Sequence, residues 1–309
     1  MISAVLLVLF LLAGALPARA GEEEIVVEEE FTLEEEEAAD DGQDFFSGRD
    51  GDIFVTADEI FTEDEPGGLP DPERELQPIP GEEEAIRAAA ADPSEENILT
   101  LAILRARYAA SLLDSFKKEN APPPAEGDSG HPLYTALAYA FSAAELRPDE
   151  PDIIFLIAQI YTAFGDNGFT LDLAEEALLQ VLELDPYYSE ARLALGALQW
   201  RERSFSLALD SLERAVSEKP ALLDLNTAAM MGSAYFLENG LARGEAFFSS
   251  ILEKNDRCGA ALFSLALVLN GGEKPGAAEA MERAVKAFEG DEKMASYARS
   301  VLEEWAALK

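Results

Sequence analysis

SEARLALGALQWRERSFSLALDSLERAVSEKP, Ser189 to Pro220, contains two helical patterns separated by a short polar turn. The second pattern ends at Pro220, because proline cannot continue a helix. Its apolar residues share one stripe at the helical spacing, namely Leu207, Ala208, Leu212, Ala215 and Val216. The stretch therefore predicts two helices joined by a turn, and the second helix buries one face.

The same ending recurs along the chain. Pro148, Pro186 and Pro220 close similar lines at intervals of 38 and 34 residues. Two further closing turns, without proline, are expected at Asn255-Asp256 and Glu289-Gly290. A period near 34 residues that holds two helices is typical of a solenoid, in which each pair packs on its neighbours.

The stretch resembles the tetratricopeptide repeat family in Leu195-Gly196, Ala208, Leu212, Ala215 and Pro220. Independently of the family, Gly196 and Ala208 lack bulk where the two helices of one unit cross, and larger residues fill the gaps between turns. The resemblance implies an all-α fold, a right-handed superhelical solenoid of antiparallel helix pairs over residues 92–309. It implies about five units and a carboxy-terminal capping helix.

The other units keep the pattern in part. Asp92-Pro93-Ser94-Glu95 predicts a helix from about Pro93 to Lys118, with Asp92 as its cap and Pro93 at the first helical position. This helix either pairs with the next one or caps the solenoid. The partial matches are Ala136, Ala140 and Ala143; Ala158, Tyr161, Ala174, Leu178 and Val181; Gly232, Tyr235, Gly244, Phe248 and Ile251; Ala266, Ala277, Met281 and Ala284; and, in the capping helix, Met294, Tyr297, Val301, Leu302 and Trp305.

The amino terminus differs from the rest of the chain. Residues 1–20 hold an apolar run followed by Pro17 and by small Ala18 and Ala20, which predicts a secretory signal peptide cut after Ala20. A membrane anchor formed by residues 2–16 is the alternative, although the run is short for a membrane span. The expected location is therefore periplasmic or secreted.

Residues 21–91 are expected to form an acidic, largely disordered leader and a proline-rich linker. Residues 21–96 carry 29 Asp or Glu against three Lys or Arg, so most of the net charge of −38 lies there. Such blocks of like charge disfavour a packed core and repel nucleic acid. Residues 44–61, DFFSGRDGDIFVTADEIF, are richer in apolar side chains and are open to a strand, a hairpin or a segment that orders when bound.

The side chains needed for catalysis are nearly absent. The sequence has one His, His131, in a loop rich in proline and glycine, and one Cys, Cys258, in an apolar helical pattern that favours an unreactive buried thiol. We find no glycine-rich phosphate loop and no Cys or His pair at metal spacing. No enzymatic activity, cofactor or metal is expected.

In the resembled family the first helix of each unit lines a concave groove, which implies a partner-binding site here. The expected groove residues are Phe155, Gln159, Leu193, Ala197, Trp200, Asn226, Met230, Ser233, Phe236 and Phe263. Apolar side chains stand where some family members hold cations, so binding of a peptide carboxylate is not implied. An apolar and amide-lined groove suits an extended or helical peptide with hydrophobic side chains.

These features favour a non-enzymatic scaffold of the cell envelope or extracellular space that binds a partner protein or peptide. The alternative is a surface protein that binds cations or basic proteins through its acidic leader, with the solenoid as an anchor. A third hypothesis places the leader in the groove as an internal competitor. Nucleic acid is not an expected partner, and membrane contact is expected only if the amino-terminal segment is retained.

Overall fold

The computed structural model describes residues 79–124, 130–165 and 168–307, and these residues form helices and turns. The signal peptide and residues 21–78 of the leader lie outside the described residues. Within them, no helix combines the length and the apolar character needed to cross a membrane. The helices are α3 (Glu82–Ala91), α4 (Glu95–Glu119), α5 (Pro132–Leu146), α6 (Pro151–Ala163), α7 (Gly168–Leu184), α8 (Ser189–Arg201), α9 (Phe205–Glu218), the short 3-10 helix η1 (Pro220–Leu222), α10 (Leu225–Leu237), α11 (Leu241–Lys254), α12 (Gly259–Gly271), α13 (Ala277–Ala287) and α14 (Glu292–Ala307).

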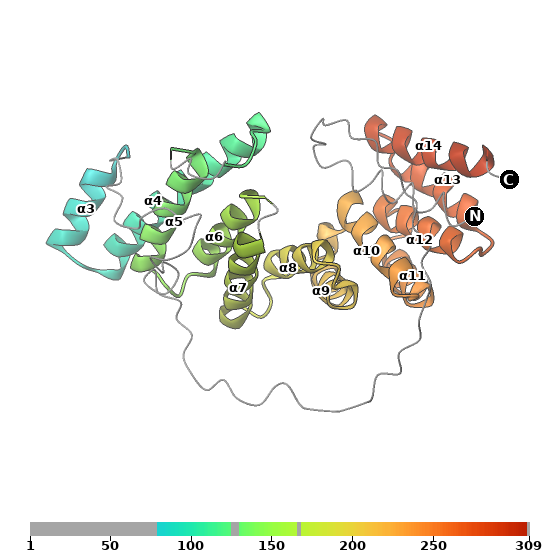
Figure 1. Ribbon diagram of the computed structural model, residues 1–309, viewed down its shortest axis with the longest axis horizontal. Coiled ribbons are helices and arrows are strands. Elements are labelled where there is room, and N and C mark those ends of the chain that lie inside the picture. Colours follow the sequence, from blue (N-terminus) through green and yellow to red (C-terminus); the bar gives the residue numbers. More distant parts are fainter. Residues whose placement is uncertain (1–78, 125–129, 166–167, 308–309) are drawn as a thin grey trace, which may run out of the picture.

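The helices form pairs that follow one another in chain order across the molecule (Figure 1). The pairs are α4 with α5, α6 with α7, α8 with α9, α10 with α11, and α12 with α13, and α14 packs on α13 at the end. The predicted all-α solenoid of helix pairs is thus confirmed. The helix α4 pairs with α5, which decides between the two roles left open for it.

The closing turns lie where the sequence places them. Arg147, Lys219 and Asn255 each follow a second helix with extended backbone angles, at φ −143°, −133° and −146°. Each donates its N–H to the carbonyl four residues earlier, so the last helical bond is made before the chain leaves the axis. Asn255 has this geometry without a following proline, because the turn depends on the backbone angles and proline only enforces them.

The third repeat packs as predicted. A Cβ atom added at Gly196 of α8 would lie 2.7 Å from Leu212 Cγ and 3.2 Å from the Ala208 carbonyl oxygen of α9. Leu212 and Ala208 are themselves fully buried. The two helices therefore cross so closely that only glycine fits at this position.

The fourth repeat packs differently. A Cβ atom added at Gly232 of α10 would have its nearest contact at 3.7 Å, with Leu267 of α12, and none with α11. The close approach between α10 and α11 lies instead at Gly244, where an added Cβ atom would meet the ring of Tyr235 at 2.7 Å. Accordingly, α10 packs more extensively on α12 than on its own partner.

The helical region begins earlier than predicted. Residues 82–91, which the sequence assigns to the leader, form α3, and Ser94 rather than Asp92 caps α4 by accepting a bond from the Asn97 N–H at 3.5 Å. Glu82 is only 3% exposed and its carboxylate accepts a bond from Arg105 Nε at 2.8 Å. A run of glutamates that suggests a solvated leader thus includes one buried ion-pair partner.

Candidate functional site

The predicted groove residues lie on four successive first helices, at helical spacing on each. Gln159 lies four residues after Phe155 on α6, and α8 carries a row of three. Helix α10 carries four, and α12 carries one. The residues by helix are Phe155 and Gln159; Leu193, Ala197 and Trp200; Asn226, Met230, Ser233 and Phe236; and Phe263.

A hydrogen bond joins the rows on α8 and α10. The indole Nε1–H of Trp200 donates to Ser233 Oγ at 2.9 Å, and Ser233 Oγ–H donates to the Met230 carbonyl oxygen at 2.8 Å. Trp200 remains half-buried, but Ser233 is only 4% exposed. Ser233 is therefore a support for the indole ring, and its predicted place on a partner-binding surface is wrong.

The predicted place of Phe263 on the partner-binding surface is also wrong. Its side chain is fully buried, and its ring lies 5.8 Å from the ring of Tyr297, measured between centroids. Tyr297 belongs to α14, so the capping helix closes over the first helix of the fifth repeat. Phe263 is thus part of the core and is not accessible to a partner.

Phe155 and Phe236 are half-buried and face neighbouring repeats. The Phe155 ring lies 5.2 Å from the Tyr188 ring, and Tyr188 Oη–H donates to Asp152 at 2.7 Å. The Phe236 ring lies 3.3 Å from the position of a Cβ atom on Gly271. Both rings mainly fix the contact between one repeat and the next.

The remaining predicted residues are half-buried or exposed, and we call them the first-helix face. This face combines aliphatic, aromatic and amide side chains and contains no charged group. Its residues are Gln159, Leu193, Ala197, Trp200, Asn226 and Met230. Such a surface offers van der Waals contact and amide hydrogen bonds, without the cations that hold a carboxylate or phosphate.

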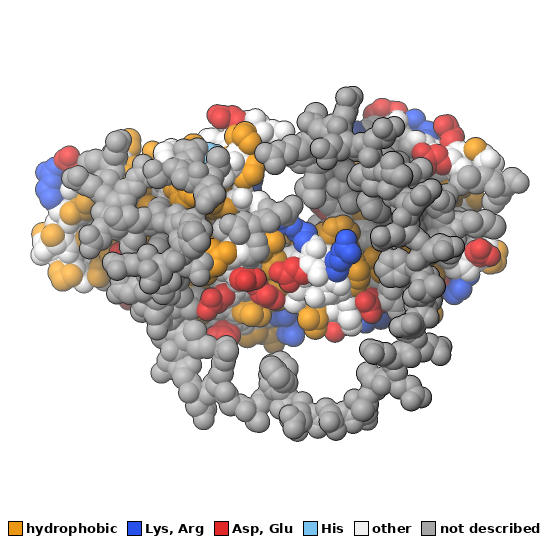
Figure 2. Space-filling model, in the orientation of Figure 1, with side chains coloured by type: hydrophobic (Ala, Val, Ile, Leu, Met, Phe, Trp, Pro, Cys, Tyr) orange, Lys and Arg blue, Asp and Glu red, His pale blue; other side chains and the backbone are white. Residues whose placement is uncertain are grey.

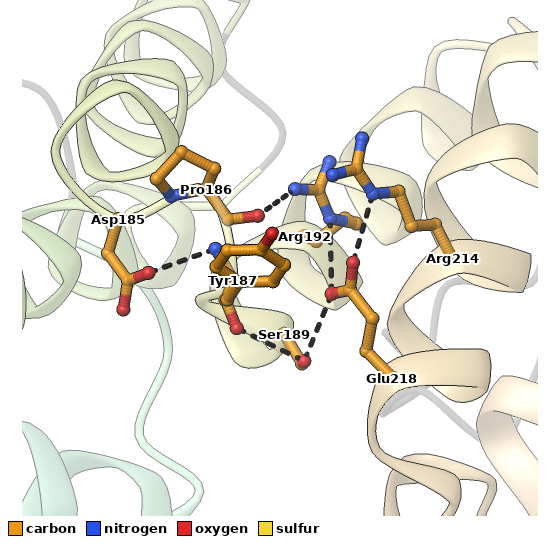
Figure 3. A network of polar contacts seen from close by, with 7 residues as sticks. All are labelled: Asp185, Pro186, Tyr187, Ser189, Arg192, Arg214 and Glu218. Carbon is orange, nitrogen blue, oxygen red and sulfur yellow. Dashed lines mark hydrogen bonds and ion pairs between the residues drawn. The ribbon is translucent and has the colours of Figure 1, made fainter.

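A network of polar contacts holds α8 in place beside this face (Figure 3). Glu218 of α9 accepts from Arg214 Nε at 3.0 Å and from Ser189 Oγ at 3.3 Å, and its carboxylate lies 3.7 Å from Arg192 Nε. Arg192 also donates to the carbonyl oxygen of Pro186 in the closing turn. Burial lowers the pKa of Arg192. Its contacts with Glu218 and Pro186 fix the beginning of α8, the helix that carries Leu193.

No local pattern in the sequence indicates this network, because Arg192 and Glu218 lie 26 residues apart along the chain. A second missed network joins α9, α10 and α11. Arg243 lies 2.6 Å from Asp210 and 2.7 Å from Glu213, and Glu213 accepts a bond from Tyr235 Oη at 2.6 Å. Both networks tie a second helix to neighbouring helices.

Acidic side chains are a general feature of the surroundings. On the side of the molecule drawn in Figure 2, acidic groups gather near the centre among hydrophobic ones. Burial raises the pKa of Glu175, and the carboxylates of Glu202 and Asp172 raise it further. A further negative charge beside Glu175 is therefore disfavoured.

The residues considered as candidates for chemistry have the following places in the described part of the chain. No group of three or more His, Cys, Asp or Glu side chains in these parts of the chain is placed to hold a metal ion. His131 caps α5, because its Nδ1 accepts a bond from the Leu133 N–H at 3.3 Å. Cys258 precedes α12 and is half-buried rather than fully buried as predicted.

Comparison with known proteins gives similarity of fold only. No family model and no curated protein matches the chain. Among solved structures, it is similar to YrrB, described as a TPR protein with an unusual peptide-binding site, at 18% identity and a TM-score of 0.45, over 71% of this chain and 99% of that one. It is similar to MamA from Desulfovibrio magneticus at 18% identity and a TM-score of 0.44, over 60% of this chain and 97% of that one. It is similar to PilF from Pseudomonas aeruginosa at 13% identity and a TM-score of 0.42, over 67% of this chain and 99% of that one.

The fold itself rests on the chain's own geometry. Five helix pairs in the described residues, closing turns at Arg147, Lys219 and Asn255 with similar backbone angles, and the tight crossing at Gly196 agree with the resemblance to the tetratricopeptide repeat. The chain has the fold of tetratricopeptide-repeat proteins.

Proposed function

We propose that the protein is a non-enzymatic scaffold that binds a partner protein or peptide on its first-helix face. The observation that supports this most directly is the joined row on α8 and α10. Trp200 is half-buried and bonded to Ser233 of α10, whose hydroxyl also donates to the Met230 backbone carbonyl, and on α10 Met230 is half-buried and Asn226 exposed. Aromatic and Met side chains of this kind are enriched where proteins bind one another.

The partner that fits has hydrophobic side chains and no net negative charge. The first-helix face supplies apolar contact and amides, and residues 97–309 carry 32 Asp or Glu against 19 Lys or Arg, which disfavours an anionic chain. We further propose that binding takes place in the cell envelope or extracellular space. The support for this location is the sequence of residues 1–20.

The binding site is tested with a photoreactive amino acid placed in the full chain. At Asn226 it lies on the first-helix face, and at Leu207 of α9, which is 57% exposed, it serves as the control on a second helix. We expect envelope or secreted proteins to be captured from position 226 and not from position 207. Equal capture from both positions would overturn the proposal.

A matched pair of substitutions then measures affinity for the captured partner. Ala197→Glu puts a charge on the first-helix face, and Leu207→Glu puts the same charge on α9. A charge buried in an interface without a partner costs at least about 1.4 kcal/mol, so we expect Ala197→Glu to raise Kd by about tenfold or more. An unchanged Kd for Ala197→Glu would contradict binding at this face.

A further inference from the structure

Helix α3 ends with the same backbone geometry that closes the first, third and fourth repeats. Asp92 has φ −142° and ψ 96°, and its N–H donates to the Ala88 carbonyl oxygen at 2.9 Å. Lys219, which closes the third repeat, has φ −133° and ψ 84° and donates to the Ala215 carbonyl oxygen at 2.9 Å. Proline follows in both cases. In the solenoid, α3 therefore occupies the place of a second helix.

The face of α3 that would contact a first helix is uncovered in the described part of the chain. In the third repeat, Ala208 and Ala215 are fully buried beneath neighbouring helices. Ala208 and Ala215 lie 12 and 5 residues before Pro220. The residues at the same distances before Pro93 are Gly81, which directly precedes α3, and Ala88 within α3. A Cβ atom added at Gly81 would meet nothing within 4 Å, and Ala88 is exposed.

The other side of α3 is packed. It lies against α4, with Glu82 buried and Ala89 half-buried, and Ala85, also half-buried, lies at the edge between this side and the uncovered face. Ile79, just ahead of the helix, is 6% exposed and belongs to the core of the first repeats. The helix is thus held in the position of a second helix, with small residues where a first helix would cross it.

The chain ahead of α3 contains a segment with the pattern of a first helix. Residues 52–62, DIFVTADEIFT, place a small residue between two isoleucines at spacings of four and three. The first helix of the second repeat has the same spacing around its own small residue. The two sets are Ile53, Ala57 and Ile60, and Ile154, Ala158 and Tyr161.

The connection is long enough for docking within one molecule. Residues 63–78 join this segment to Ile79, and a chain of that length spans up to about 50 Å when extended, against an interhelical distance of about 10 Å. A long proline-containing connection already joins a first to a second helix in this protein. It runs from Asn120 to His131, between α4 and α5.

We propose that residues 52–62 dock as a helix on the uncovered face of α3 and complete a sixth repeat at the amino-terminal end. The occupant is this chain's own segment, since a tether of this length gives an effective concentration in the millimolar range. Ala57 then crosses α3 near Ala85, as Gly196 crosses α9 at Leu212. Gly81 and Ala88 permit the close approach.

The crossing is tested by disulfide formation in the full chain with Cys258→Ala as background. Ala57→Cys is combined with Ala85→Cys, and, as a control, with Ala90→Cys on a different side of α3. We expect the first pair to form an intramolecular disulfide about tenfold faster than the control under mild oxidation. Equal rates would overturn the proposal, as would a disulfide between two molecules, which would identify a second copy as the occupant.

Hydrogen exchange gives a second readout. Ala88→Arg blocks the uncovered face without disturbing a buried site, and Ala90→Arg is the matched control. We expect the amides of residues 53–61 to exchange slowly in the unmodified chain and in Ala90→Arg, and at least about tenfold faster in Ala88→Arg. The same exchange rate in all three proteins would refute docking on this face.

Discussion

Trp200 of α8 donates its indole N–H to Ser233 Oγ of α10 across 2.9 Å, and this bond joins the first helices of the third and fourth repeats. Trp200→Phe keeps an aromatic ring and removes the donor, so we expect a loss of about 1 kcal/mol in the free energy of unfolding. Urea unfolding of Trp200→Phe, Ser233→Ala and the double variant measures the interaction free energy between the two side chains. If the two single losses simply add in the double variant, the bond makes no energetic contribution.

Two glycines at equivalent places in their repeats are expected to respond in opposite directions to alanine. At Gly196 the added Cβ atom would lie 2.7 Å from Leu212 Cγ, so Gly196→Ala should destabilise the protein by about 1–3 kcal/mol. At Gly232 the nearest atom is 3.7 Å away, so Gly232→Ala should stabilise α10 by up to about 1 kcal/mol. Thermal unfolding distinguishes them, and a lower Tm for Gly232→Ala would contradict the packing described for α10.

The turns between paired helices contain residues in the left-handed region. Arg203, Asn239 and Glu273 have φ of 64°, 52° and 52°. This conformation costs a residue with a Cβ atom about 1 kcal/mol, and asparagine tolerates it better than arginine does. We expect Arg203→Gly to raise Tm by a few degrees and Asn239→Gly to change it less. A fall in Tm for Arg203→Gly would show that its side chain makes a stabilising contact.

Alkaline pH is expected to weaken the carboxy-terminal cap through Tyr297. Burial raises the pKa of Tyr297 to about 12, and the carboxylate of Glu304 adds to the rise. In the unfolded chain a tyrosine ionises near pH 10, so the folded state loses stability as the pH rises from about 10 toward 12. We expect Tyr297→Phe to show a smaller decrease in Tm over this interval than the unmodified protein, although both contain other tyrosines. If Tm falls equally with pH in the two proteins, Tyr297 does not contribute to the loss of stability.

The amino terminus gives a prediction that does not depend on the solenoid. If residues 1–20 direct secretion, the mature protein begins at Gly21. Amino-terminal sequencing of protein isolated from the envelope or medium of the expressing cell reads this directly. A protein that retains residues 2–16 and sediments with membranes would support the anchor instead.

The sequence predicted the helix pairs and their closing turns because both depend on local signals. Helices α5, α7 and α9 each end shortly before a proline, namely Pro148, Pro186 and Pro220. Gly196 indicates a close crossing of the two helices within one repeat. The surface was predicted less well. Phe263 follows the same helical spacing as its neighbours, but α14 covers it, and no local pattern reveals which later helix will do so.

Two other features depended on distant partners. Glu82 stands among glutamates that suggest a solvated leader, and only Arg105, 23 residues later, makes it a buried residue. Gly232 has the spacing of a crossing within its repeat, but the stacking of α10 on α12 places it beside Leu267. The period of a repeat is local, whereas the way in which neighbouring repeats stack depends on many side chains together.

The ion pair between Glu82 and Arg105 also has a mechanical consequence. Glu82 accepts from the Ile79 N–H at 3.1 Å as well as from Arg105, which in turn donates to Ser142 of α5. A pull on the chain ahead of Ile79 is thus transmitted through this pair to both helices of the first repeat at once. The start of α3 is thereby connected to α4 and α5 directly, in addition to its connection through the turn between α3 and α4.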